Sequence, residues 1–301
     1  KGKYENYCPN CESSASVKEF VPENEFQDLE EWDSSPTGIP LFPYEEIRDG
    51  QRQFIDDVAR AISEKKTLVA YAPTGIGKTV AVLVPAIEES LKTGRKILFL
   101  TSKQSQHRIA IETIRLIKAR YGIDISAVDI VSKQDMCPRD ISHEYHVVFN
   151  ALCMLEQKNK TCRYHTKKVK GLESKICKGI LHVDELKDLA SGLGVCPHRA
   201  AVEAGIRSNI VICDYNYVFY SHVAETMLKM LETELKDCII IVDEAHNLPD
   251  RIRGHNSKEM TANRIQEEAA LAFPRCQRMV RRHGDLEKYL FDRFNLSKQL
   301  E

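Results

Sequence analysis

The chain has 301 residues, of which 43% are hydrophobic, so it can bury one large core or two ordinary ones. Its formal net charge of -1 neither favours nor excludes a nucleic-acid partner, because such partners respond to local charge. It has no run of about 18 apolar residues and no apolar signal-peptide core near its start, so we expect neither a membrane span nor a signal peptide in this sequence. We therefore expect an intracellular protein, cytoplasmic in a prokaryote or nuclear in a eukaryote.

We predict an acidic N-terminal extension over residues 1–40. Within it, the segment Glu19–Asp33 carries seven acidic residues and no basic one, and a stretch rich in Pro, Ser and Gly follows. The pair Cys8 and Cys11 has the spacing of a zinc knuckle, but no second pair lies nearby. Half of a zinc site and two unligated thiols are equally open for this pair.

Beyond residue 49, helix-like and strand-like segments alternate along the chain. The strand-like segments are short, unbroken apolar runs, as expected of parallel strands that are buried on both faces. This alternation predicts an α/β fold with one parallel sheet. The predicted helices are 50–63, 79–92 and 105–120, and the predicted strands are 67–72, 96–101, 126–132, 209–214 and 238–246.

The stretch 137–200 interrupts this alternation. It contains five of the ten cysteines and a basic run, and it has no comparable apolar strand, so we predict an insertion into the α/β domain. In an intracellular protein of this size, ten cysteines favour metal ligation over disulfides. After Asn247 the chain turns to polar segments of helical pattern, such as 262–273.

The stretch YAPTGIGKT has the features of a phosphate-binding loop between a strand and a helix. Gly75 and Gly77 can take backbone angles that let amide groups converge on an anion. Lys78 adds a positive charge, and the Thr79 hydroxyl is expected to bind Mg²⁺ at the positive end of the following helix. Ala72 stands where the common pattern has glycine. The predicted loop comprises Thr74, Gly75, Ile76, Gly77, Lys78 and Thr79.

The stretch CIIIVDEAHN supplies two groups that a phosphate-binding loop lacks, namely a carboxylate for Mg²⁺ and a base for the attacking water. Four apolar residues predict a strand, and Asp243 follows at its carboxyl end, where ligands of α/β sheets gather. We predict that Asp243 joins Thr79 in binding Mg²⁺ and that Glu244 polarises the attacking water. His246 is expected to link the nucleotide state to the rest of the protein. Lys78, Asp243 and Glu244 are therefore the predicted catalytic residues.

These motifs together resemble the XPD-like superfamily-two DNA helicases. Asp243–His246 reads DEAH, like motif II of that superfamily, and the stretches 41–51, 97–106 and 208–219 resemble other family segments. The resemblance implies a RecA-like motor domain in which Gln51 contacts the adenine of ATP. It also implies that Thr101 and Lys103 contact the DNA backbone.

The resemblance further implies a domain order and an activity. The expected parts are the motor domain over 41–136 and 201–249, an iron-sulfur insertion over 137–200 and the start of a helical arch over 250–301. The implied function is ATP-dependent translocation on single-stranded or forked DNA, 5′ to 3′, by a monomer that works with repair-complex proteins. The chain is expected to be incomplete, because no second motor domain follows. The alternatives are an ATP-gated nucleic-acid-binding module without unwinding activity and a DEAH-type RNA helicase.

The family's insertion carries a 4Fe-4S cluster on four thiolates. By sequence context, the resemblance assigns the ligands to Cys137, Cys153, Cys162 and Cys196, while Cys177 is the spare thiol or a replacement for Cys196. A zinc site is the chemical alternative, but the insertion lacks the paired CxxC knuckles that such sites usually show. The histidines of the insertion are expected at the surface, namely His143, His146, His165 and His198.

A basic run, Lys158–Lys178, lies inside the insertion. It contains eight Lys or Arg and one Glu, which suits contacts with DNA phosphates but equally suits a solvated helix face. Tyr164 and His165 within the run could stack on unpaired bases. Outside the insertion, Cys213 and Cys238 fall in predicted strands and are expected to be buried thiols.

Overall fold

The computed structural model describes residues 36–73 and 75–256. Residues 1–35 of the predicted extension 1–40, with Cys8 and Cys11, and the predicted helical segment 262–273 lie outside the described residues. The described end of the predicted extension packs on the core, where Ile39 is buried. The described elements are α1 (Gln51–Ser63), α2 (Lys78–Thr93), β1 (Lys96–Leu100), α3 (Gln104–Tyr121), β2 (Ala127–Ile130), the 3-10 helix η2 (Asp140–His143), α4 (His146–Lys158), α5 (Arg163–Thr166), α6 (Leu172–Gly179), α7 (Val183–Gly192), α8 (Pro197–Arg207), β3 (Ile210–Cys213), α9 (Asn216–Phe219), α10 (Ser221–Met230), η3 (Leu235–Asp237), β4 (Cys238–Val242), η4 (Ala245–Asn247) and α11 (Leu248–Asn256).

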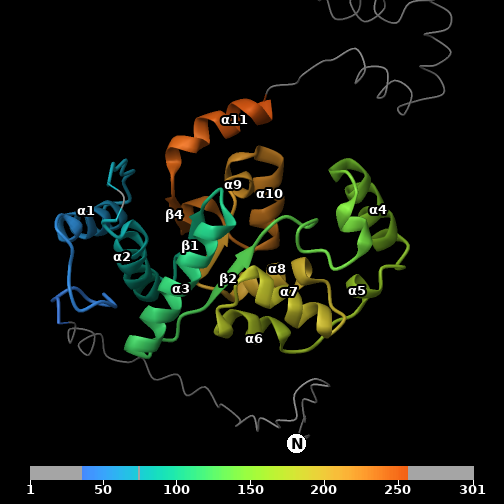
Figure 1. Cartoon of the computed structure of the whole chain (residues 1–301), viewed down its shortest axis with the longest axis horizontal. Coiled ribbons are helices and arrows are strands. Elements are labelled where there is room, and N and C mark those ends of the chain that lie inside the picture. Colours follow the sequence, from blue (N-terminus) through green and yellow to red (C-terminus); the bar gives the residue numbers. More distant parts are fainter. Residues whose placement is uncertain (1–35, 74, 257–301) are drawn as a thin grey trace, which may run out of the picture.

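The four described strands form one parallel sheet in the order β2-β3-β1-β4 (Figure 1). In the inner strand β1, Leu100 pairs with Cys213 of β3 on one side and with Val242 of β4 on the other. The carboxyl ends of three neighbouring strands therefore lie together. The α/β fold with a parallel sheet is confirmed, and each predicted strand that corresponds to β1–β4 overlaps the observed one.

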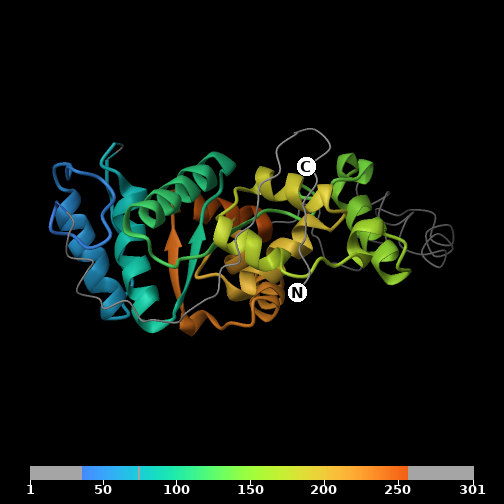
Figure 2. The ribbon, with the colours of Figure 1, turned by 90° about the horizontal axis from the view of Figure 1, so that it is seen from below.

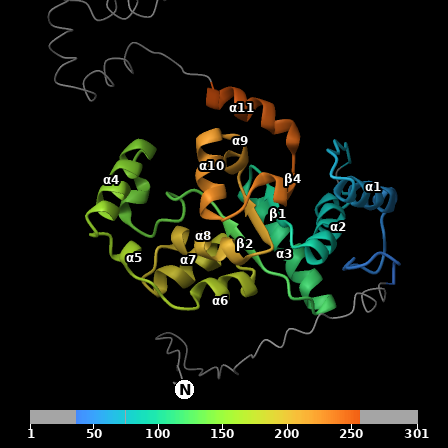
Figure 3. The ribbon, with the colours of Figure 1, turned by 180° about the vertical axis from the view of Figure 1, so that it is seen from behind.

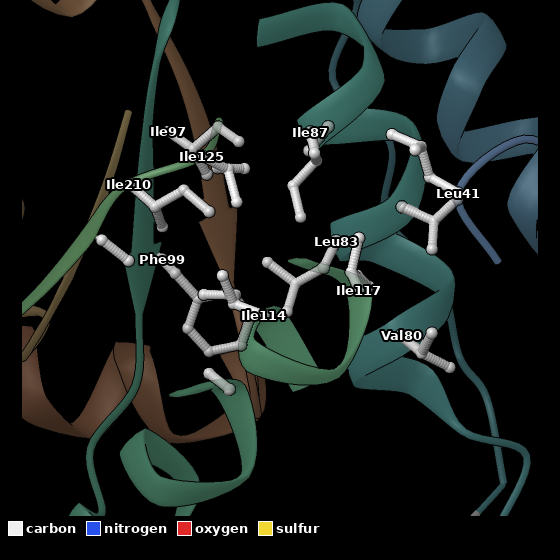
Figure 4. Packing of buried hydrophobic residues seen from close by; sticks show 14 of the residues in the cluster. Leu41, Val80, Leu83, Ile87, Ile97, Phe99, Ile114, Ile117, Ile125 and Ile210 are labelled. Carbon is white, nitrogen blue, oxygen red and sulfur yellow. The ribbon is translucent and has the colours of Figure 1, made fainter. Parts of the chain in front are cut away.

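Alternation along the strands divides the core into two layers. In β1, Ile97 and Phe99 face one layer, whereas Leu98 and Leu100 face the other, because successive side chains point to opposite faces of a sheet. Figure 4 shows Phe99 and its strand neighbours packed against isoleucines and leucines of α2 and α3. Helices α1–α3 cover this face, and α6–α8 cover the opposite face (Figure 2).

The predicted strand at 67–72 is wrong in this structure. Residues 67–73 form neither helix nor strand, and the side chains of Val69 and Tyr71 are 91% and 98% exposed. The segment has the apolar composition of a strand, but composition alone does not fix pairing, which depends on a partner edge. The described part of β4 accordingly forms the outer strand on that side of the sheet.

The predicted insertion 137–200 divides into two parts. Helices α4 and α5 lie at the opposite end of the molecule from α1 and α2 (Figure 3). By contrast, α6–α8 bury Ile176, Leu186 and Ala201 in the same layer as Leu98 and Val211 of the sheet. The part that projects from the sheet is therefore shorter than the predicted range, because the amphipathic helices after Gly171 complete the core.

A buried carboxylate ties the outer strand β2 to its surroundings. Asp129 is fully buried, and its Oδ1 lies 2.5 Å from Nδ1 of His107 on α3. Its other oxygen, Oδ2, accepts a hydrogen bond of 3.0 Å from the backbone N–H of Val183 at the start of α7. The ring of His182 lies 3.8 Å from the same oxygen. One side chain thus joins a strand, a helix of the motor domain and a helix of the predicted insertion.

Candidate nucleotide site and thiol group

The predicted phosphate-binding loop has the backbone geometry that its glycines were expected to supply. Gly75 and Gly77 have φ values of 90° and 81°, in the region that favours glycine. Helix α2 begins at Lys78, so its positive N-terminal end lies directly after the loop. Ile76 and Thr79 are half-buried, and Thr74 lies outside the described residues.

The structure brings this loop to the DEAH residues. Lys78 Nζ lies 3.8 Å from Glu244 Oε1 and 3.3 Å from the carbonyl oxygen of Ala72. Both side chains of the ion pair are about one-third exposed, at 32% and 31%. On the other side of Glu244, Oε2 lies 3.3 Å from Nδ1 of the exposed His246. We call the residues Gly75–Thr79, Asp243 and Glu244 the nucleotide site.

Asp243 lies at the end of β4 with its carboxyl group partly buried beside Glu244. Burial raises the pKa of its carboxyl group, and the charge of Glu244 raises it further, while Lys78 and a backbone N–H act in the opposite direction. Its backbone N–H donates to the carbonyl of Leu100, which fixes the residue at the end of β4. A divalent cation bound beside these two carboxylates would favour their ionised forms.

Two residues before and within α1 reach the loop from the opposite side. The side chain of Gln51 is buried, and its Nε2 donates to the Gly77 carbonyl at 3.4 Å. A Cβ added at Gly77 would meet Gln51 Nε2 at 2.4 Å, so a larger residue would displace the end of the Gln51 side chain in addition to straining the positive φ. The Arg48 guanidinium donates to the carbonyl of Gly75. Sequence reasoning missed Arg48, although it lies three residues before the glutamine that was singled out.

The two residues expected to contact DNA differ in exposure. Thr101 is fully buried and its hydroxyl donates to Gln106 Oε1, so its side chain does not face solvent. Lys103 is exposed and lies at the residue before α3. Of this pair, only the lysine side chain is placed to reach a phosphate.

The four cysteines chosen as ligands influence one another, and the fifth does not belong to them. Burial raises the pKa of the Cys137 thiol, and the thiols of Cys153 and Cys196 raise it further. Cys196 is affected in the same way by Cys153 and Cys162, again after burial. The pKa of Cys177 is raised to about 11 by burial, and its Sγ donates to the Ala204 carbonyl at 2.9 Å. We call the first four residues the four-thiol group.

Hydrogen-bond donors surround the four-thiol group. The backbone N–H of Arg139 points to Cys137, and those of His198 and Arg199 point to Cys196, each lowering the thiol pKa against the effect of burial. The Gln157 amide donates to the Sγ of Cys153 at 3.0 Å. Donors of this kind favour thiolates over thiols. Within residues 36–73 and 75–256, no three His, Cys, Asp or Glu side chains are placed to hold a single metal ion.

The other predicted residues of the insertion and strands have mixed surroundings. His198 is half-buried, and burial and then Lys133 lower its pKa to about 4. Burial, followed by Arg199, also lowers the pKa of His165. Cys213 and Cys238 are buried, as predicted. All eight cationic side chains of the basic run are exposed, namely Lys158, Lys160, Arg163, Lys167, Lys168, Lys170, Lys175 and Lys178.

Comparison with known proteins decides the family. The DEAD_2 family model matches residues 99–265, which is more than half of the 301-residue chain. The chain belongs to the DEAD_2 family. The match runs from the last two residues of β1 through β2, β3 and β4, and it includes the four-thiol group and the DEAH residues. The predicted resemblance to XPD-like helicases is thereby confirmed.

The relatives and a solved structure agree with this DEAD_2 assignment. The chain is 24% identical to the general transcription and DNA repair factor IIH helicase subunit XPD of Schizosaccharomyces pombe, covering 69% of this chain and 30% of that protein. It is 24% identical to a probable ATP-dependent helicase of Methanocaldococcus jannaschii, covering 84% of this chain and 38% of that protein. The chain thus spans about a third of these relatives' length.

A solved structure of truncated XPD superimposes with a TM-score of 0.50 at 18% identity, covering 72% of this chain and 58% of that one. This likeness concerns the fold alone, and it supports the RecA-like motor domain. In the described residues, no helix is long and apolar enough to cross a membrane.

Proposed function

We propose that the chain is the ATP-binding part of an XPD-like DNA helicase. The observation that carries the proposal is the approach of Lys78 Nζ to Glu244 Oε1, 3.8 Å apart although the residues are 166 positions apart in sequence. Lys78 and the loop amides would hold the phosphates, and Thr79 with Asp243 would hold Mg²⁺. Glu244 would then orient the water that attacks the γ-phosphate. His246, in contact with Glu244, would relay the state of the site to the partner motor domain.

The four-thiol group is proposed to hold the 4Fe-4S cluster. The donor set suits it, because four thiolates are the usual ligands and N–H donors stabilise their charge. When bound, the cluster would tie together segments that begin at Cys137 and end at Cys196. The buried, hydrogen-bonded Cys177 is left out of this set.

Single-stranded or forked DNA is the proposed substrate. Lys103 and the cationic side chains of the basic run are exposed, so they can reach phosphates without rearrangement of the core. The names of the relatives, which include a DNA repair factor subunit, support DNA over RNA and repair-complex proteins as partners. Movement 5′ to 3′ and action as a monomer are part of the same proposal.

Strand separation by the intact protein tests this function. Forked duplexes with a 5′ tail should be opened in the presence of ATP and Mg²⁺, and ATP hydrolysis should rise with single-stranded DNA more than with RNA of the same length. Preference for RNA would instead favour the DEAH-type RNA helicase. Hydrolysis without strand separation would favour the ATP-gated binding module, and opening only of 3′-tailed duplexes would overturn the direction.

The metal and the basic run have separate tests. Anaerobically purified protein should contain about four irons, and Cys196→Ser should lose them while Cys177→Ser keeps them. Colourless protein with one zinc would refute the cluster. Replacing Lys167, Lys168 and Lys170 by Ala should weaken single-strand binding. It should also reduce the slope of log affinity against log salt concentration by about 0.7 per lost phosphate contact. The same change at Lys66, Lys229 and Lys236, exposed lysines outside the run, is the control.

A further inference from the structure

Tyr215 lies where the ends of three strands meet. It is fully buried two residues after β3, and its ring packs in the layer that α6–α8 cover. Its hydroxyl donates to the carbonyl of Asp243 and lies 3.1 Å from that of Glu244, both directly after β4. The turn after β1 is joined to the same segment, because the backbone N–H of Thr101 donates to the Cys213 carbonyl at 3.0 Å, two residues before Tyr215. Burial raises the pKa of the Tyr215 phenol, and the neighbouring Ser102 hydroxyl lowers it as a hydrogen-bond donor. One hydroxyl therefore joins the segments that follow β3, β1 and β4.

The backbone of Glu244 needs such a support. Its φ and ψ are 51° and 43°, a left-handed conformation that is unfavourable for a residue with a Cβ. Conformations of this kind persist where surrounding contacts hold them. The Glu244 carbonyl accepts from Tyr215 and, within the next turn, from the backbone and side-chain N–H groups of Asn247. The direction of the Glu244 side chain toward Lys78 depends on this peptide.

Ser102 stands on the side of the site that is proposed to face DNA. It lies between the buried Thr101 and the exposed Lys103, and it is itself half-buried. A shift of this turn when Lys103 binds a phosphate would reach Tyr215 through the Ser102 hydroxyl. The same phenol would transmit the shift to the peptide that orients Glu244. The path would run from the turn at Lys103 through the Tyr215 phenol to the backbone carbonyls of Asp243 and Glu244.

We propose that Tyr215 is a positioning residue that couples single-stranded DNA binding to the nucleotide site through its hydroxyl. The proposal rests on the proposed function, since it needs both ligands. The hydroxyl sets the factor by which one bound ligand changes the affinity for the other. It leaves the affinity for each ligand alone unchanged. Because binding free energies are linked, DNA must strengthen nucleotide binding by the same factor by which the nucleotide strengthens DNA binding.

Tyr215→Phe removes the hydroxyl and keeps the buried ring. Tyr217→Phe is the matched control, because the Tyr217 hydroxyl also donates to a carbonyl just after a strand, that of Val131 at 2.9 Å, on the side of β2 rather than of β4. Ser102→Ala removes the other hydroxyl of the path at a half-buried position. If Tyr215→Phe fails to fold, Ser102→Ala still tests whether the two ligands are coupled through this contact.

The experiment measures four dissociation constants for each variant of the intact protein. A fluorescent single-stranded oligonucleotide is titrated with and without a non-hydrolysable ATP analogue and Mg²⁺, and the analogue is titrated with and without the oligonucleotide. We expect a wild-type coupling factor on the order of 5–150, which falls toward one in Tyr215→Phe and Ser102→Ala and is kept in Tyr217→Phe. The affinities for each ligand alone should stay within about twofold of wild type.

Other outcomes overturn the inference in distinguishable ways. A coupling factor that survives in Tyr215→Phe, or that falls equally in Tyr217→Phe, would refute the role of the hydroxyl and leave the proposed function intact. So would a wild-type protein that binds both ligands independently. A wild-type protein that binds neither ligand would refute the proposed function, and the inference with it.

Discussion

The outer strand β2 has every residue buried, whereas β4, at the other edge of the sheet, leaves the side chain of Ile240 39% exposed. Around β2, Asp129 is held by His107 of α3 and by the start of α7. Beside β4 lie the half-exposed residues of the nucleotide site. The comparison teaches that the sheet is fixed at the edge where the predicted insertion packs, and that the site is built at the edge that remains accessible.

Hydrogen exchange should show the largest difference between the two edges. We expect the amides of β2 to exchange only on global unfolding, whose free energy is about 5–15 kcal/mol in proteins of this kind, because they lie in the buried layer. The amides of residues 67–73 should exchange with almost no protection, since they are outside helices and strands. Mass spectrometry of peptides from both segments measures this. Strong protection of 67–73 in the nucleotide-free protein would contradict the open edge.

Removing the carboxylate of Asp129 should destabilise the edge of the sheet that β2 forms. Asp129→Ala leaves the buried His107 and the Val183 N–H without a partner, so we expect the free energy of unfolding to fall by about 3–5 kcal/mol. Chemical denaturation measures this loss. Asp57→Ala, which removes an exposed ion pair with Arg60, is the control and should cost no more than about 1 kcal/mol. Equal losses in the two variants would show that Asp129 does not tie the edge together.

Asp243→Asn should change the free energy of unfolding by less than Asp129→Ala does, and it should raise it instead of lowering it. The pKa of Asp243 is raised in the fold, so the folded protein binds its proton more tightly than the unfolded chain does. Its contribution to stability is therefore present at low pH and is lost as the pH rises through the folded pKa. Without nucleotide or Mg²⁺, Asp243→Asn should raise the free energy of unfolding at neutral pH, and the gain should vanish below the unfolded pKa. A loss of stability at neutral pH would show that the carboxylate is better compensated than its surroundings indicate.

Much of this fold could be predicted from local pattern. The apolar runs at β1–β4 and the glycines before α2 each carry enough information within a few residues, because burial on both faces and a positive φ restrict the residue types. The segment 67–72 has the same apolar pattern and yet is unpaired, since pairing depends on a partner edge that sequence does not specify. The packing of α6–α8 on the sheet was not predicted, because cysteines and basic residues interrupt the apolar pattern along these helices.

The candidate site was predictable where chemistry requires a residue type in a motif. Lys78, Asp243 and Glu244 belong to such motifs, and the structure brings them together. Tyr215, Arg48 and Asp129 act through contacts between segments distant in sequence, so no local pattern marks them. The position of Tyr215 just beyond a parallel strand was the one available signal, because ligands and supporting residues gather at carboxyl ends.

The central claim is that Lys78 and Glu244 serve one nucleotide site in different roles. Nucleotide affinity and ATP turnover of the intact protein, measured together in Lys78→Ala and Glu244→Gln, test it most directly. Lys78→Ala should lose both, because it removes the charge that binds phosphate. Glu244→Gln should keep its affinity and lose turnover by about a hundredfold or more, since it removes only the group that orients water. Turnover at the wild-type rate in either variant would contradict the account.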